Sequence, residues 1–201
     1  MPDEQSLIRA AAAGDRDAFD ELVRIKRERV VRTAMQITGN LDDALDVAQG
    51  VFLKLWQGLD RFDPRRKFDT WLYRITVNAA IDMLRSRGPR GILQPLPPEP
   101  AEIGAVTEAD ADEALDLGRL QQAFLRLAGG LAPKQRAAFV LREIEGLETA
   151  EVARVMGVTE STVRNHLMQA RRLLRAGLLR DYPALVPGRG DDDRNGGGSD
   201  A

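Results

Sequence analysis

Cysteine is absent from this 201-residue chain, and histidine occurs only once, as His166. A disulfide framework and a thiolate metal site are therefore excluded, and so is a metal centre built from several histidines. We expect neither a metal nor any other cofactor.

Long hydrophobic runs are also missing. No stretch approaches the roughly 20 apolar residues that a membrane-spanning helix needs. Residues 1–6 have neither the basic segment nor the apolar run of a signal peptide. The sequence predicts a soluble, cytoplasmic protein with no membrane insertion.

Strand patterning is lacking too, because valine and isoleucine nowhere alternate with polar residues over a strand-length run. Apolar residues recur instead at three- and four-residue spacing, the period of an amphipathic helix. Hydrophobic residues make up 43% of the chain and charged residues 30%, enough for buried cores under a charged surface. The fold class is therefore predicted to be all-α.

Glycine and proline divide this helical chain into two small domains. Proline and glycine crowd residues 88–100, where they forbid regular helix, and an acidic, alanine-rich piece follows. Helices are expected over about 6–13, 15–38, 41–59, 70–86, 112–127, 133–146, 149–156 and 159–180. The predicted organisation is a first domain over 1–87, a flexible acidic linker over 88–112, a second domain over 113–180 and a disordered acidic tail over 181–201.

Capping residues mark two of the helix starts. Asp15 or Asp17 is placed to cap the second helix, and Asn40 to cap the third. Asp42 and Asp43 then fall in the first turn of the third helix, where the helix dipole favours acidic side chains.

The net charge of −2 hides a strong segregation of charge along the chain. Residues 60–90 carry eight basic and four acidic side chains, and residues 131–180 carry nine and five. The rest of the chain is net acidic. A basic island on a helix is the electrostatic footprint of phosphate contact, although a solvated helix face explains the same charges.

The strongest motif is a helix-turn-helix at residues 149–167, TAEVARVMGVTESTVRNHL. Gly157 permits the turn, Thr159 is placed to cap the second helix, and the small Ala153 allows the two helices to cross closely. This is the residue pattern of a DNA-binding turn, although an ordinary helical hairpin is the plain alternative. The shared core is predicted to contain Val152, Val155, Val158, Val163 and Leu167.

The second helix of this motif exposes polar side chains suited to the major groove. Arginine pairs with guanine there, and asparagine or glutamine pairs with adenine. The candidate DNA-binding residues are Ser161, Thr162, Arg164, Asn165, His166, Gln169, Arg171 and Arg172.

Three segments together resemble the extracytoplasmic-function (ECF) group of bacterial sigma factors, in the sigma-70 family. Residues 43–56, DALDVAQGVFLKLW, resemble the family's polymerase-binding helix. Residues 68–85, FDTWLYRITVNAAIDMLR, resemble the segment that melts and reads the −10 element. Residues 131–147, LAPKQRAAFVLREIEGL, resemble the start of the −35-reading domain. The likeness covers about 5–90 and 113–178, in the family's order, as sigma regions 2 and 4.

The resemblance implies a non-enzymatic subunit that directs RNA polymerase to promoters. Its expected partners are promoter DNA, the clamp of the polymerase's largest subunit, the flap region of the second subunit and an anti-sigma factor. The implied polymerase-binding residues are Asp43, Asp46, Gln49, Phe52 and Trp56. The implied −10 residues are Phe62, Arg65, Arg66, Lys67, Phe68, Tyr73, Arg74, Asn78, Asp82 and Arg85, with Trp71 expected in the core. Rings among basic residues suit unstacked single-stranded DNA.

The sequence departs from the family in places. Gly50 and Leu45 stand where the family commonly has acidic residues, and His166 and Gln169 stand where it often has basic ones. Polymerase affinity and the −35 sequence are the properties that these changes affect.

Two other functions remain open at this point. Asp42, Asp43 and Asp46 fit the DDxxD pattern with which all-α isoprenoid synthases hold magnesium, although five residues match easily by chance and no second acidic motif follows. A stand-alone helix-turn-helix regulator would bind duplex DNA without polymerase. No nucleophile–base pair is evident, so the sequence gives an enzyme no positive support.

Overall fold

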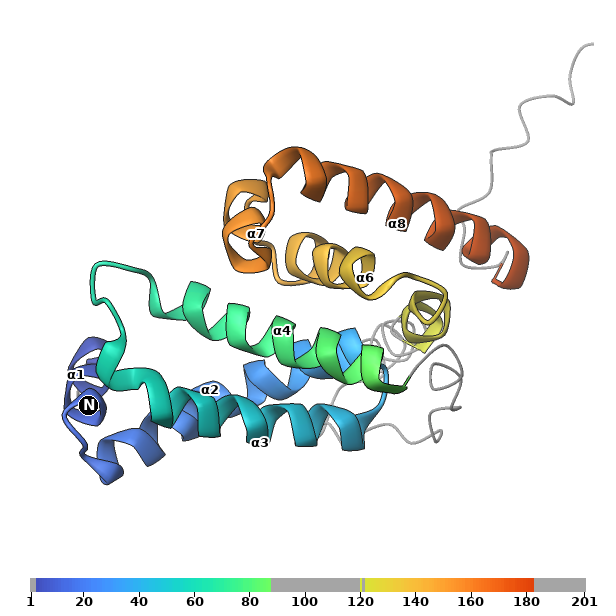
Figure 1. The fold of residues 1–201 in the computed structure, drawn as a ribbon. Coiled ribbons are helices and arrows are strands. Elements are labelled where there is room, and N and C mark those ends of the chain that lie inside the picture. Colours follow the sequence, from blue (N-terminus) through green and yellow to red (C-terminus); the bar gives the residue numbers. More distant parts are fainter. Residues whose placement is uncertain (1–2, 88–119, 121, 183–201) are drawn as a thin grey trace, which may run out of the picture.

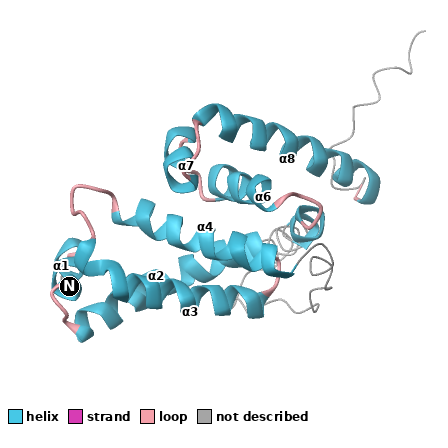
Figure 2. Ribbon diagram, viewed as in Figure 1, coloured by secondary structure: helices cyan, strands magenta, loops and turns pink. Residues whose placement is uncertain are grey.

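A computed structural model describes residues 3–87, 120 and 122–182, and the regular elements in these residues are all helical (Figure 1, Figure 2). The all-α prediction is confirmed. The predicted linker lies outside the described residues, and so does the predicted tail apart from its first two positions. Within the described part of the chain, no helix has both the length and the hydropathy to cross a membrane.

The N-terminal half, residues 3–87, is a bundle in which α2, α3 and α4 pack along one another (Figure 1). Leu22, Ile37, Val51, Leu55 and Val77 are completely buried between them. The elements are α1 (Glu4–Ala12), α2 (Arg16–Thr38), α3 (Leu41–Gly58), a 3₁₀ turn (Leu59–Arg61) and α4 (Phe68–Arg87).

The C-terminal half comprises residues 120 and 122–182. Residues 122–128 are helical, and α6 (Pro133–Phe139), α7 (Thr149–Met156) and α8 (Glu160–Asp181) follow. Between α6 and α7 the chain forms a π-helix, Val140–Ile144, where a single α-helix to Gly146 was expected. The Glu145 N–H donates to the Val140 carbonyl 2.9 Å away, a five-residue spacing. This wide turn keeps Val140 and Leu141 fully buried, a packing requirement that the α-helical period does not reveal.

The predicted caps form as expected. The Ala18 N–H donates to Asp15 Oδ1 at 3.0 Å, and the Asp43 N–H donates to Asn40 Oδ1 at 3.0 Å. In the C-terminal half, the Thr162 N–H donates to Thr159 Oγ1 at 3.2 Å. Each bond satisfies a backbone donor that the first turn of a helix leaves free.

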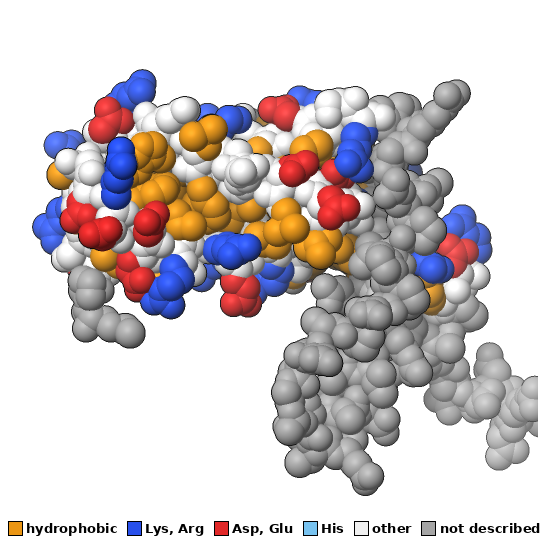
Figure 3. Space-filling view, turned by 90° about the horizontal axis from the view of Figure 1, so that it is seen from below, with side chains coloured by type: hydrophobic (Ala, Val, Ile, Leu, Met, Phe, Trp, Pro, Cys, Tyr) orange, Lys and Arg blue, Asp and Glu red, His pale blue; other side chains and the backbone are white. Residues whose placement is uncertain are grey.

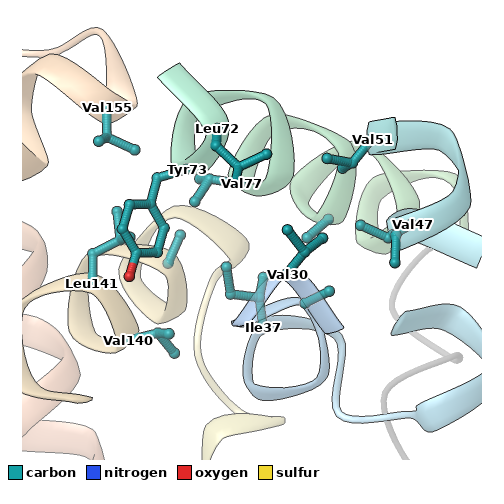
Figure 4. Packing of buried hydrophobic residues seen from close by; sticks show 14 of the residues in the cluster. Val30, Ile37, Val47, Val51, Leu72, Tyr73, Val77, Val140, Leu141 and Val155 are labelled. Carbon is teal, nitrogen blue, oxygen red and sulfur yellow. The ribbon is translucent and has the colours of Figure 1, made fainter. Parts of the chain in front are cut away.

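A hydrophobic core extends through both halves, because α4 packs on α6 and α7 as well as on α2 and α3. Figure 4 shows Tyr73 extending from α4 toward Val140 and Leu141, with Val155 of α7 close by. Polar bonds cross the same contact. Glu145 accepts from Tyr73 Oη at 2.7 Å and from Thr33 Oγ1 at 2.9 Å.

A buried arginine joins α6 to the end of α2. Arg136 is 2% exposed, and its Nε donates to the Gln36 carbonyl at 2.8 Å, in the last turn of α2. A Cβ at Gly39, the left-handed residue that ends α2, would lie 2.8 Å from Arg136 Nη2. Burial lowers the pKa of Arg136 to about 10, so the side chain stays charged at neutral pH and satisfies the Gln36 carbonyl at the negative end of the α2 dipole.

Candidate nucleic-acid interface

The helix-turn-helix predicted from the sequence is formed by α7, a turn at Gly157 and α8. Gly157 has a φ of 64°, a left-handed conformation that side chains rarely adopt, and it directs the chain from one helix into the next. Every third or fourth residue of α8 is buried, from Val163 through Leu167 and Ala170 to Leu174. The opposite face of α8 is therefore open.

Six of the eight residues predicted on α8 are exposed, and Thr162 and His166 are half-buried. Three of the exposed side chains already have partners within the chain. Arg164 Nη2 lies 2.9 Å from Glu160 Oε2, and Arg171 Nη2 lies 2.6 Å from Glu143 Oε1. Gln169 Oε1 accepts from Gln135 Nε2 of α6 at 2.5 Å. The exposed residues are Ser161, Arg164, Asn165, Gln169, Arg171 and Arg172.

His166 lies where burial and the positive charge of Lys134 both act on its ring. Both effects lower its pKa below the ordinary value of about 6.5. Both effects favour the uncharged ring, and His166 differs in this respect from the basic residues that the family often has there.

The second group of predicted residues forms a polar stripe along α4. Arg74, Asn78, Asp82 and Arg85 are all exposed, and their spacing of four, four and three residues places them on one face. Arg85 Nη1 lies 3.8 Å from Asp82 Oδ1. Arg65, Arg66 and Lys67 are also exposed, on the loop that leads into α4.

An open hollow of about 590 Å³ lies where α3 ends and α4 begins. The rings of Phe62 and Trp71 are stacked there, with centroids 5.1 Å apart and planes inclined by 27°. Trp71, which was expected in the core, is half-buried and lines the hollow. The lining residues are Lys54, Gln57, Gly58, Arg61, Phe62, Asp63, Arg66 and Trp71.

Sequence reasoning missed the contributions of Lys54, Gln57 and Arg61 to this hollow. Lys54 and Gln57 belong to α3, outside the segment assigned to DNA, and Arg61 of the 3₁₀ turn was not among the residues predicted to contact it. The signal was present in part, because Arg61 lies within the basic island at 60–90.

Two residues predicted to contact DNA are covered in this structure. Phe68 is 6% exposed, and it packs edge-on against Phe62 with a centroid distance of 5.5 Å. Tyr73 is 7% exposed beneath the C-terminal half, and its hydroxyl donates a hydrogen bond to the Glu145 carboxylate. Burial and then this hydrogen bond raise the pKa of Tyr73 far above its ordinary value. Neither ring is open to a base in this arrangement.

The polymerase-binding residues predicted on α3 also divide by exposure. Asp46 and Gln49 are exposed, Phe52 is half-buried, and Trp56 is 36% exposed. Asp43 is 2% exposed and pairs with Arg87 of α4, so it faces the protein and not a partner. Burial raises the pKa of Asp43, although the charge of Arg87 opposes this.

Besides Trp56, the same face of α3 exposes hydrophobic side chains that were not among the predicted polymerase-binding residues. Seen from below the view of Figure 1, the N-terminal half carries a band of hydrophobic side chains bordered by charged ones (Figure 3). Trp56 meets Phe19 of α2 edge-on, with ring centroids 4.8 Å apart. The exposed hydrophobic residues of α3 are Leu41, Leu45, Leu53 and Trp56.

Magnesium binding by the DDxxD pattern receives no support from the geometry. Asp43 is turned inward to Arg87, whereas Asp42 and Asp46 are exposed. Within the described residues, no three carboxylates, histidines or cysteines gather closely enough to hold a metal ion.

Comparison with known families assigns both halves of the chain. The family model Sigma-70 region 2 matches residues 22–90, and the model Sigma-70, region 4 matches residues 121–174. The two models occur in the order that the sequence motifs predicted.

Individual relatives agree with this assignment. The ECF RNA polymerase sigma factor SigW of Bacillus subtilis is 31% identical over 183 residues, which cover 84% of this chain and 92% of SigW. The ECF RNA polymerase sigma-E factor of Escherichia coli K12 is 33% identical over 176 residues, covering 85% and 92%. Among solved structures, CnrH in complex with the cytosolic domain of CnrY aligns with a TM-score of 0.64 at 28% identity, covering 89% of this chain and 98% of that one. These matches favour a sigma factor over a stand-alone regulator, and the chain belongs to the ECF group of the sigma-70 family, the factors that bind RNA polymerase and direct it to specific promoters.

Proposed function

We propose that this sigma factor divides promoter recognition between two surfaces and binds polymerase with a third. The polar stripe of α4 and the adjoining hollow take the single-stranded −10 element, α8 reads the duplex −35 element, and α3 docks on the polymerase clamp. In this proposal region 2 spans 1–87 and region 4 spans 113–180, joined by a linker over 88–112. The observation that carries the proposal is the stacked aromatic hollow with a basic rim, beside the polar stripe.

Single-stranded DNA fits the hollow for two physical reasons. An unstacked base gains about 1–3 kcal/mol by stacking on an aromatic ring. Arg61 and Arg66 at the rim supply positive charge for the backbone phosphates. The amide of Asn78, exposed on α4, is suited to hydrogen bonds with a base edge. Phe68 supports the hollow by packing against Phe62, Tyr73 packs against the C-terminal half, and neither takes a direct part.

Duplex DNA fits α8 because its open face combines short polar and basic side chains at helical spacing. Asn165 is suited to adenine and Arg172 to guanine or phosphate. Arg164 and Arg171 must give up their carboxylate partners to contact DNA, which reduces their net contribution to the binding free energy. Exposed ion pairs are worth little, so this exchange is inexpensive.

Polymerase docking fits α3 because its exposed face combines hydrophobic side chains with acidic and amide groups. Trp56 and Leu53 supply apolar area, and Asp46 and Gln49 supply partners for basic residues of the clamp. Region 4 meets the flap of the second large subunit, as the family resemblance implies.

The remaining proposals concern an anti-sigma partner, the cellular location and the absence of catalytic activity. The sigma factor RpoE of Bartonella quintana is bound to the anti-sigma factor NepR in its solved structure. By analogy, we propose that this chain also binds an anti-sigma factor. It acts in the cytoplasm with polymerase and has no catalytic activity of its own.

The test is transcription by the purified protein with bacterial core polymerase on a library of promoter-like DNA. We expect specific starts that require the protein, and the enriched sequences give both elements. Asn78→Ala should relax the choice of −10 sequence, whereas Arg164→Ala and Asn165→Ala should reduce −35 dependence. Arg24→Ala, which removes an exposed arginine of α2, is the control and should change neither. If Asn78→Ala left −10 selection intact and Arg164→Ala left −35 selection intact, the assignment of both helices would be wrong.

A further inference from the structure

Met168 is the most exposed large hydrophobic residue in the described part of the chain, with 61% of its surface open. It lies on α8, where the buried stripe is formed by Val163, Leu167, Ala170 and Leu174. A single exposed hydrophobic residue is common on protein surfaces and needs no explanation by exposure alone. The position of Met168 on the helix carries the inference.

Met168 occupies the middle of the outward face of α8. Asn165 precedes it by three residues and Arg172 follows it by four, so all three side chains lie on one face of the helix. Asn165 and Arg172 are exposed, as Met168 is. An apolar, flexible side chain is thereby placed between two side chains suited to base edges.

The major groove presents one prominent apolar group to a protein. This group is the C5-methyl of thymine, and apolar side chains contact it in sequence-specific complexes. Methionine has three rotatable bonds and a polarisable sulfur, so its side chain adapts to a group at slightly variable depth. A cytosine at the same position offers an amino donor that a thioether serves poorly.

We propose that Met168 selects a thymine in the −35 element by covering its methyl group, between the bases contacted by Asn165 and Arg172. The inference rests on the proposed role of α8 and makes that role specific. It assigns one base that the polar residues of α8 do not determine.

The experiment uses holoenzyme, assembled from core polymerase and the full chain, on the promoter selected above. Each thymine of the −35 element is replaced in turn by deoxyuridine, which deletes only the methyl group. One replacement is expected to weaken binding by the wild-type holoenzyme about fourfold, as burial of one methylene-sized group predicts. With Met168→Ala, the thymine and deoxyuridine promoters should bind equally, because nothing remains to cover the methyl group.

Leu179→Ala is the matched control. Leu179 is 53% exposed on the same helix but lies 11 residues further on, about 16 Å along the axis. The effect of the methyl group should persist in this variant. Met168→Leu keeps an apolar side chain and should retain most of the discrimination.

The inference is overturned if no thymine shows an effect of its methyl group, or if the effect persists unchanged in Met168→Ala. A separate measurement distinguishes this from failure of the α8 assignment. If scrambling the whole −35 element changes binding and Asn165→Ala diminishes that change, α8 reads the element and only the role of Met168 is wrong. If Asn165→Ala and Arg164→Ala leave the effect of scrambling intact, the placement of α8 on the DNA is wrong.

Discussion

The bond between Tyr73 and Glu145 is a contact between the two halves that removal of a single oxygen atom breaks. The Glu145 side chain is 5% exposed, and its carboxylate accepts from Tyr73 at 2.7 Å and from Thr33 at 2.9 Å. Hydrogen bonds to charged groups contribute about 1.5–3 kcal/mol, and the carboxylate that loses one stays buried. Tyr73→Phe should therefore lower the free energy of unfolding by about 2 kcal/mol.

A double-mutant cycle separates this bond from other effects of the substitution. Tyr73→Phe, Glu145→Gln and the combined variant are unfolded with urea, and the interaction free energy is expected to be about 1–2 kcal/mol. Thr38→Val supplies the control, because the Thr38 hydroxyl donates to the Ala34 carbonyl within α2 and shares no partner with Glu145. Thr38→Val should cost stability without coupling to Glu145→Gln. An interaction free energy near zero for Tyr73 and Glu145 would refute the packing of the two halves in the free chain.

The ionisation of Tyr73 gives the same contact a second readout. The chain has only two tyrosines, so Tyr182→Phe leaves Tyr73 as the only phenol to follow by ultraviolet absorbance. Burial and the bond to Glu145 raise its pKa in the folded protein above the unfolded value of about 10. Above pH 10 the unfolded state releases this proton more readily than the folded state. The contribution of Tyr73 to stability is therefore complete below pH 10 and is lost as pH rises beyond it. Ionisation at the ordinary pH in the folded protein would contradict the buried bond.

Three further predictions test other features. Gly39→Ala should destabilise the protein by about 1 kcal/mol more than Gly157→Ala in urea unfolding. Both glycines are left-handed, but only Gly39 lies close to Arg136. Equal losses of stability in the two variants would contradict that close approach. Gly50→Ala should raise the free energy of unfolding by about 0.5–1 kcal/mol, because Gly50 lies within α3 with open space around it; a loss of stability would mean that the position is occupied. Trp56→Ala should weaken binding to core polymerase about tenfold or more in a fluorescence titration, as loss of an aromatic anchor does; unchanged affinity of the folded variant would remove α3 from the interface.

Local chemistry made much of the fold predictable. The side chains of Asp15, Asn40 and Thr159 can satisfy free backbone donors only at helix starts, and each does so. Gly157 marked the turn of the helix-turn-helix, and α7 has the predicted bounds. These signals depend on residues within a few positions of one another, which is why a single sequence contains them.

Contacts between distant segments were not predictable in the same way. Periodicity shows that a helix face is buried but not which element covers it. In α4, Leu72 and Tyr73, and then Thr76 and Val77, are adjacent residues that the structure buries. Such pairs widen the buried arc beyond what one neighbouring layer needs. Tyr73 was predicted to contact DNA because an aromatic ring can stack on a base as well as pack in a core.

Asp43 shows the same difficulty for charged groups. Its place in the first turn of α3 is consistent with compensation of the helix dipole and equally with a direct contact to the polymerase. The ion pair with Arg87 depends on α4 ending beside the start of α3, some 44 positions away in the sequence, so the fold was needed to choose between these roles.

The two surfaces of α4 explain how one helix can serve both the core and the promoter. Tyr73 faces the C-terminal half and Val77 is buried, whereas Arg74 and Asn78 follow them by one residue each and are exposed. One residue corresponds to about 100° around a helix, so the polar stripe lies to the side of the contact with α6 and α7. Packing of the two halves therefore leaves the proposed −10 surface open. It follows that defects in the contact between the halves and defects in −10 reading should arise from different residues of the same helix.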